Sequence, residues 1–356
     1  MEKICVFCGE KPQNKNKEHI LPQWLIKYTG DPNRTVRFGF DKRTGEPREY
    51  SYNAFAFPAC QECNGRFADL EDKVKPILLS LLQSEKLTKI DFNILLDWFD
   101  KVRVGLWLAF YYLDKDFANI SKPRFNIASR IGLHDRMLQM IRLHESDNEL
   151  SFRGCDMLSF SFTPSCFSMI INNYCFINIS SPFLFSRRLG FPNPITGHMM
   201  ENGLVDYEMQ SGGERIMYPL IRNRFRFKGT SVYQPMFRSS KGVSYYKNRY
   251  VKDNSLSFDQ GVGEVFIELS EKAKIISSAE LDSWVPSTSY TRSNLNPGIS
   301  IETIELQLYI DSLTPSLDQL SVESRSHWMD NLQTSKQYGN EMIKTLEDNA
   351  RRLVHP

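Results

Sequence analysis

The sequence of 356 residues predicts an α+β protein with a small N-terminal module, residues 1–84, and a larger mixed α/β domain, residues 85–356. Three observations predict this class. Two Cys-x-x-Cys pairs enclose a segment of alternating and aromatic residues, a helical apolar period covers residues 91–113, and strand-like alternation recurs after residue 150. At this length, with 41% hydrophobic residues, the chain can bury a sizeable core, and about two domains are expected.

Composition excludes a generally basic protein. The 44 basic and 42 acidic residues give a net charge of +2, so affinity for nucleic acid has to come from local clusters. The first residues contain scattered charges and no apolar core of signal-peptide length. The longest charge-free run, residues 158–185, contains prolines and alternates in "LSFSFTP", which favours buried strands over a membrane helix. We expect a soluble, cytoplasmic protein without a membrane partner.

The cysteines are the strongest local signal. Cys5 and Cys8 form "CVFC", and Cys60 and Cys63 form "CQEC". Two such pairs in a chain without a secretion signal favour a tetrahedral structural Zn²⁺ site over disulfides. A redox pair is the alternative, although one pair on a thioredoxin-like background would be enough for it. The other cysteines have no ligand spacing and are expected to be buried thiols: Cys155, Cys166 and Cys175.

Between the cysteine pairs the sequence predicts a hairpin around "RTGEP". After the second pair, apolar residues recur at helical spacing, so Cys63 and Asn64 are expected to open a helix. Before the hairpin, "KEHILPQW" places Glu18 beside His19. Because the ordinary pKa of histidine lies near neutrality, a histidine beside a carboxylate is a candidate proton acceptor or metal ligand.

The order of "CVFC", "EHILP" and "CQECN" resembles the HNH endonuclease family, in the branch that carries two cysteine knuckles. The resemblance covers residues 1–80 and implies a ββα-metal fold for the module. It also implies that His19 is the general base of phosphodiester hydrolysis. It implies that Glu18 and Asn64 hold a catalytic divalent ion, while the four cysteines hold the structural zinc.

The chemistry is consistent with these residue types. Hydrolysis of a phosphodiester needs a deprotonated water and positive charge near the phosphate. Oxygen ligands suit Mg²⁺ or Mn²⁺, whereas thiolates select zinc. Glu71 lies two turns beyond Asn64 on the same helical face and is a further candidate ligand, with a solvated helix charge as the alternative. The loop-fixing asparagine of the family has one candidate here, Asn53.

The larger domain is expected to be helical over 85–149, strand-rich over 150–312 and helical over 313–356. A buried helix is predicted at 91–113, and a second one at "HDRMLQMIRLHE", residues 134–145. A hairpin is predicted in "CFSMIINNYCFINI", with its turn at the two asparagines. Further strands are predicted in "GEVFIELS", "AKIISS" and "IELQLYIDS", and amphipathic helices are predicted near the C-terminus.

A basic, aromatic segment covers residues 215–252, with ten Lys or Arg residues and no acidic one. Basic side chains neutralise phosphates, and aromatic rings stack on unpaired bases. If "RNRFRFK" is a strand, its basic residues share one side and its phenylalanines the other. A solvated strand face over an aromatic core is the alternative. The predicted nucleic-acid contacts are Arg222, Arg224, Arg226, Lys228 and, in the N-terminal module, Arg66.

The sequence thus predicts a metal-dependent endonuclease whose C-terminal domain recognises a substrate, a partner or a signal. The resemblance implies DNA rather than RNA as substrate and a role as a restriction or anti-phage effector. Two alternatives remain: a non-catalytic zinc module that binds nucleic acid, and a toxin-like effector that is silent without a partner. Because a module with one site cuts a duplex only as two copies, a homodimer is expected, or a partner protein of a defence system.

Overall fold

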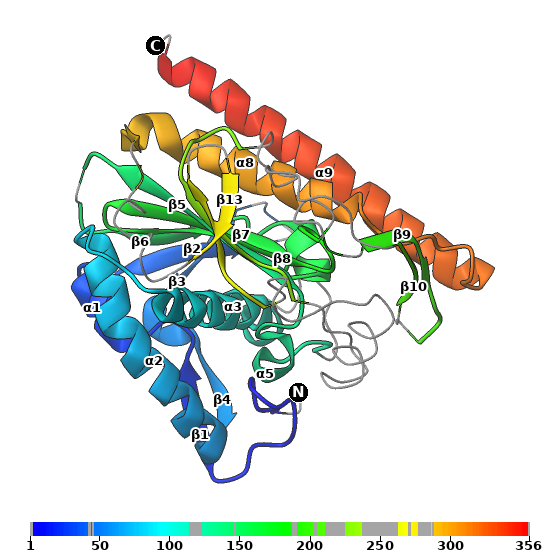
Figure 1. Ribbon diagram of the computed structural model, residues 1–356, viewed down its shortest axis with the longest axis horizontal. Helices are drawn as coiled ribbons and strands as arrows, with labels where there is room; N and C mark the ends of the chain where they lie inside the picture. Colours follow the sequence, from blue (N-terminus) through cyan, green and yellow to red (C-terminus); the bar gives the residue numbers. More distant parts are fainter. Residues whose placement is uncertain are drawn as a thin grey trace.

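The protein is described from a computed structural model and combines helices with one large sheet and three two-stranded sheets within the described residues (Figure 1). The structure describes residues 3–41, 44, 46–113, 123–145, 147–186, 191, 193–202, 205–210, 225–236, 263–269, 272–276, 286 and 288–354.

The large sheet is the centre of the molecule. Its strand order is β13-β12-β11-β5-β8-β7-β6, with every neighbouring pair antiparallel, and β14 adds to β5 in parallel. The strands are β5 (Asp135–Leu143), β6 (Leu150–Arg153), β7 (Cys166–Ile171), β8 (Tyr174–Ser181), β11 (Thr230–Gln234), β12 (Phe266–Leu269), β13 (Lys272–Ile275) and β14 (Ser289–Tyr290).

Helices cover both faces of this sheet. Helix α3 (Lys89–Tyr112) packs on one face, and α8 (Arg292–Asp311) packs on the other. The long helix α9 (Val322–Val354) lies along the outer side of α8 (Figure 1). Shorter elements complete the domain: α5 (Ile127–Arg130), α6 (Leu158–Phe162), and the hairpin of β9 (Asn193–Met199) and β10 (Val205–Gln210).

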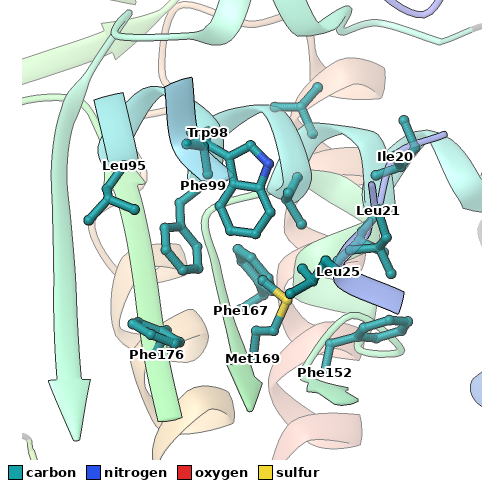
Figure 2. Packing of buried hydrophobic residues seen from close by; sticks show 14 of the residues in the cluster. Ile20, Leu21, Leu25, Leu95, Trp98, Phe99, Phe152, Phe167, Met169 and Phe176 are labelled. Atoms are coloured by element: carbon teal, nitrogen blue, oxygen red, sulfur yellow. The ribbon is translucent and has the colours of Figure 1, made fainter. Parts of the chain in front are cut away.

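Alternate residues of the central strands belong to two cores. On β8, Phe176 faces α3, where its ring lies 5.2 Å from that of Phe99. Its neighbours Cys175 and Ile177 belong to the cluster of α8. Figure 2 shows Phe99 directed at Phe167 and Phe176, with residues of the N-terminal segment, such as Leu25, in the same cluster. The core on the α3 side is therefore continuous from the sheet into the N-terminal module.

The N-terminal module contains two antiparallel pairs and one long helix. Strand β1 (Lys15–His19) pairs with β4 (Ala56–Cys60), and β2 (Thr35–Phe40) pairs with β3 (Pro47–Ser51) as the predicted hairpin. The short helix α1 (Gln23–Tyr28) follows β1, and η1 (Tyr52–Ala54) precedes β4. Helix α2 (Gln61–Leu82) begins directly after β4 and packs on α3.

Three local predictions for the larger domain are wrong. Residues 134–145 contain the strand β5, residues 304–312 lie in α8 except for its C-cap Ser312, and "LSFSFTP" begins with α6. The physical reason for β5 is burial on both faces: seven consecutive residues from Asp135 to Ile141 are buried, which removes the period-2 alternation of a half-exposed strand. In the other two segments tertiary contacts override the local alternation.

Other predictions are confirmed. The β7–β8 hairpin turns at Asn172, whose φ of 48° is the left-handed conformation that asparagine tolerates. The helix predicted at 91–113 is α3, which begins with a capping box between Thr88 and Asp91. The C-terminal tract forms α9. Among the described helices, none is long and apolar enough to span a bilayer.

Candidate functional site: the cysteine cluster and the Glu18–His19 segment

The four predicted zinc ligands meet in space. The Sγ atoms of Cys5, Cys8, Cys60 and Cys63 all lie within 4.8 Å of one another. Four thiolates at about 2.3 Å from a tetrahedral Zn²⁺ ion would have sulfurs about 3.8 Å apart, so the cluster is close to the size that zinc requires. These residues can hold a metal ion such as zinc.

Backbone groups prepare the cluster for this role. Cys60 ends β4, and its amide N donates to Cys5 Sγ at 3.3 Å, while the amide N of Gln13 donates to Cys60 Sγ at 3.3 Å. Burial and the neighbouring thiols raise the pKa of Cys63 to about 12. The thiolate form of Cys63 is therefore disfavoured unless a cation compensates its charge, which fits this residue to a metal ion.

The cluster fixes the strand pair that carries Glu18 and His19. Lys15 pairs with Cys60 across β1 and β4, and His19 pairs with Ala56 at the other end of the ladder. Helix α2 starts where β4 stops, so a metal at the cluster would join the N-terminal turn to both the strand and the helix. The local arrangement is two antiparallel strands followed by a helix.

Glu18 and Glu71 are brought together by a lysine from α3. The Lys101 ammonium lies 2.5 Å from Glu18 Oε1 and also donates to Glu71 Oε1. Lys101 is completely buried, and the Glu18 side chain is 9% exposed. Burial opposes its charge, but the two carboxylates outweigh this effect, so the pKa of Lys101 lies above its ordinary value. Burial raises the pKa of both carboxyl groups, and Lys101 partly offsets that rise.

His19 belongs to a second polar contact. Its Nδ1 lies 3.1 Å from the side-chain Nε2 of Gln23, and the same Nε2 donates to Asn53 Oδ1 at 3.0 Å. Partial burial lowers the pKa of His19, and the nearby Glu71 carboxylate raises it to a smaller extent. This lowering favours the neutral ring, which is the state that can accept a proton. Asn53 is thus connected to His19 through Gln23.

The remaining predicted residues of the module are placed separately. Asn64 lies in the first turn of α2, and its Oδ1 is buried with no hydrogen-bond partner among the described residues. Arg66 is exposed, with its guanidinium carbon 5.3 Å from the ring centroid of Phe67. Neither residue forms a described hydrogen bond or ion pair with Glu18 or His19.

The basic segment is only partly described. Arg222 and Arg224 lie outside the described residues. Residues 225–229 are not a strand, which corrects that part of the expectation, because the buried Glu302 carboxylate accepts the amide N–H groups of Arg226 and Phe227 and holds the backbone in a bend. The Arg226 guanidinium pairs with Glu305 at 2.6 Å, and the amide N of Lys228 donates to Tyr290.

Sequence reasoning missed two residues of the site. Lys101 lies in a helix whose sequence predicts a role in core packing. Gln23 lies in a segment whose sequence also predicts packing. One signal was available for Lys101: it follows the buried Trp98 by three residues and so shares its side of the helix. A charge at such a position needs a buried partner. Nothing in the sequence marks Gln23.

The site does not fit the divalent ion that the HNH resemblance implies. Glu18 precedes His19 in the sequence and the Glu71 carboxylate acts on the pKa of His19, and both carboxylates are bound to the Lys101 ammonium. Mg²⁺ and Mn²⁺ would need these oxygens as ligands, together with waters. Asn64 has a buried amide oxygen with no hydrogen-bond partner among the described residues, and Glu71, two turns further along α2, is bound to Lys101.

Comparison of the chain with family models, curated proteins and solved structures returned no match in any of the three.

Proposed function

We propose that the N-terminal module is a phosphodiesterase of the HNH type, with His19 as its general base and a structural zinc ion at the four cysteines. The observation that carries this proposal is the placement of His19 on a strand whose partner, β4, runs into the cysteine cluster and α2. A metal at the cluster would hold strand, helix and N-terminal turn as one rigid unit. Rigid support of this kind is what a catalytic side chain requires.

His19 would remove the proton from the attacking water. The contact with Gln23 fixes the imidazole ring at Nδ1. With the Gln23 amide nitrogen facing it, Nδ1 accepts and Nε2 carries the ring proton, whereas the proposed role needs Nε2 as the accepting nitrogen. This role requires the amides of Gln23 and Asn53 in the orientation that lets Nδ1–H donate to the Gln23 amide oxygen, and amide orientations follow from such networks. Gln23 and Asn53 therefore serve as positioning residues for His19.

The substrate is proposed to be DNA, as the resemblance implies. Lys15 and Lys17 are exposed on β1, next to His19, and Arg66 is exposed on the first turns of α2. These side chains can neutralise backbone phosphates without reading the sequence. The resemblance implies a divalent ion such as Mg²⁺ or Mn²⁺ to stabilise the charge on the phosphate, but the carboxylates that would hold it are bound to the Lys101 ammonium. A restriction or anti-phage role belongs to the same proposal.

The test is cleavage of plasmid DNA, single-stranded DNA and RNA by the full chain and by His19→Ala, each with Mg²⁺, Mn²⁺ or EDTA. We expect His19→Ala to lose about 10²–10⁴-fold in rate, since that is the usual contribution of a general base. Its fold and zinc content should match the wild type. His327→Ala, which changes an exposed histidine on α9, is the matched control and should cleave normally.

A second candidate is a zinc-stapled module that binds nucleic acid without cutting it. One observation favours it: the carboxylates expected to hold a catalytic ion are both bound to the Lys101 ammonium. In that case the full chain binds DNA in a salt-dependent way, and His19→Ala changes nothing. Binding without cleavage by a zinc-loaded, folded wild type would therefore replace the first candidate with the second.

A further inference from the structure

Three elements meet at one buried ammonium. Lys101 comes from α3, Glu18 from β1 and Glu71 from α2. The lysine side chain has no exposed surface, and the two carboxylate side chains are 9% and 19% exposed. The contact with Glu18 is 2.5 Å from nitrogen to oxygen. Lys101 therefore connects the central helix of the larger domain, through ion pairs, to the strand and the helix of the N-terminal module.

We propose that the Lys101 ammonium is the resident cation of this site and takes the place of a divalent metal ion between Glu18 and Glu71. In the ββα-metal arrangement that the sequence resembles, an ion connects the strand to the following helix. Here the same two elements, β1 and α2, are connected by the side chain of a third. The site of this chain is then a built-in Lys–Glu–Glu triad, and it binds no Mg²⁺ or Mn²⁺.

The surroundings of Lys101 keep the ammonium in place. Its neighbours on α3 are held by the sheet: Asp100 pairs with Arg136 of β5 at 2.9 Å, and Arg103 hydrogen-bonds Asn178 of β8. Trp98 and Val102 are fully buried on the same helix. The helix cannot shift without breaking these contacts. Exposure of the ammonium to water would therefore disrupt the core.

A divalent ion and the ammonium cannot share the pair of carboxylates. Mg²⁺ needs near-octahedral oxygen ligands at about 2.0–2.1 Å and usually keeps several waters. The space next to Glu18 Oε1 is taken by a nitrogen at 2.5 Å, and the site is almost closed to solvent. A bound ion would also face the positive charge of Lys101 at contact distance, which is strongly unfavourable in a buried site.

Removal of the ammonium should convert the triad into a metal site. In Lys101→Met the two carboxylates face each other without a counter-charge, and a divalent cation of suitable size is the partner that balances their two negative charges. Lys101→Arg keeps the positive charge and is the matched control. The double variant Lys101→Met with Glu18→Gln removes one of the two ligands.

The experiment measures binding of Mn²⁺ to the full, zinc-loaded chain. The number of bound ions is obtained from the decrease in the electron paramagnetic resonance signal of free Mn²⁺. The Tm is recorded over a Mn²⁺ titration. We expect no bound Mn²⁺ and an unchanged Tm for wild type and Lys101→Arg. Lys101→Met should have a lower Tm that rises saturably with Mn²⁺, because a ligand that binds only the folded state stabilises it. The double variant should lose this response.

Two outcomes would overturn the assignment. One is a wild-type protein that binds Mn²⁺ and loses it on Glu18→Gln. The other is a folded Lys101→Met that gains no Mn²⁺ site. If Lys101→Met does not fold, the assignment is tested by comparing Mn²⁺ binding of the wild type with that of Glu18→Gln. Although the site is that of the proposed function, no nucleic acid takes part in the measurement, so a failure of the nuclease proposal appears separately, in the cleavage assay.

Discussion

At the scale of single residues, the central helix α3 carries three buried charges in four positions, and they belong to two separate groups of ion pairs. Lys101 binds the carboxylates of the N-terminal module, while Asp100 and Arg103 face the large sheet. Asp100 pairs with Arg103 at 2.7 Å and with Arg136 at 2.9 Å, and it accepts the amide N–H of Gly132. Although burial acts in the opposite direction, these partners lower the pKa of Asp100.

Asp100→Asn tests the weight of this buried pair. The substitution leaves two guanidinium groups with less counter-charge in the core, and breaking a buried ion pair costs about 3–5 kcal/mol. We expect a loss of about 3 kcal/mol in the free energy of unfolding, measured by chemical denaturation. Asp97→Asn is the control, because Asp97 contacts the same Arg136 but its side chain is 40% exposed. It should cost about 1 kcal/mol or less.

At the scale of elements, the junction of β4 and α2 determines the geometry of the candidate site. Cys60 is the last residue of the strand and the N-cap of the helix, and it makes no side-chain capping hydrogen bond. Its sulfur is directed to the cysteine cluster instead. A metal ion at the cluster would therefore fix the helix start that a capping side chain fixes elsewhere.

Cys60→Ser should lower the zinc content from about one ion per chain to near zero, because a hydroxyl is a poor zinc ligand. We expect the N-terminal module to unfold at a lower temperature than in the wild type. Elemental analysis and calorimetry measure the two effects. Cys155→Ala changes a buried thiol outside the cluster and should keep its zinc. Unchanged zinc in Cys60→Ser would contradict the four-cysteine site.

Helix α8 anchors the basic segment through a buried carboxyl group. Glu302 accepts the amide N–H groups of Arg226 and Phe227, at 2.7 and 3.2 Å. Although these hydrogen bonds act in the opposite direction, burial raises the pKa of Glu302 to about 8. The folded protein therefore holds this proton more tightly than the unfolded chain, whose glutamate titrates near its ordinary pKa of about 4.3.

The stability contributed by this group should fall as pH rises. It is fully present below the unfolded pKa and is lost as pH rises through the folded value of about 8. We expect the free energy of unfolding of the wild type to decline with pH more steeply than that of Glu302→Gln, by up to about 1.4 kcal/mol per pH unit between about pH 5 and 8. Urea denaturation across this range gives both slopes, and parallel slopes would refute the raised pKa.

At the scale of the whole molecule, the packing does not stop at residue 84. Phe38 of β2 lies 4.7 Å from Phe110 of α3, ring to ring, and Tyr112 donates to the carbonyl of Ile4 at 2.7 Å. The amide N of Ile127 donates to the carbonyl of Val6 at 2.9 Å. The N-terminal module thus uses the larger domain as one wall of its core.

A fragment of residues 1–84 should therefore not fold cooperatively, even with zinc. It would expose the apolar surface that α3 covers and leave Glu18 and Glu71 without Lys101. We expect broad NMR signals and no sharp calorimetric transition for the fragment, against a sharp one for the full chain. A well-dispersed spectrum of the zinc-loaded fragment would contradict this and support an independent module.

The sequence by itself determined the features that depend on local spacing. Cys-x-x-Cys pairs, the hairpin turn at the two asparagines, the helix at 91–113 and the amphipathic α9 are predicted from neighbouring residues, and the structure contains each of them. Their cause is local: ligand reach, left-handed φ and helical period act within a few residues.

Only the tertiary structure decided which strands are buried on both faces and which charges meet. Because β5 is covered by α3 and by α8, its alternation disappears and it resembles a helix in sequence. Lys101 lies 83 residues after Glu18 in the chain, and nothing local relates them. A carboxylate can bind either a metal ion or an ammonium. Packing between distant segments places the Lys101 ammonium against Glu18 and Glu71.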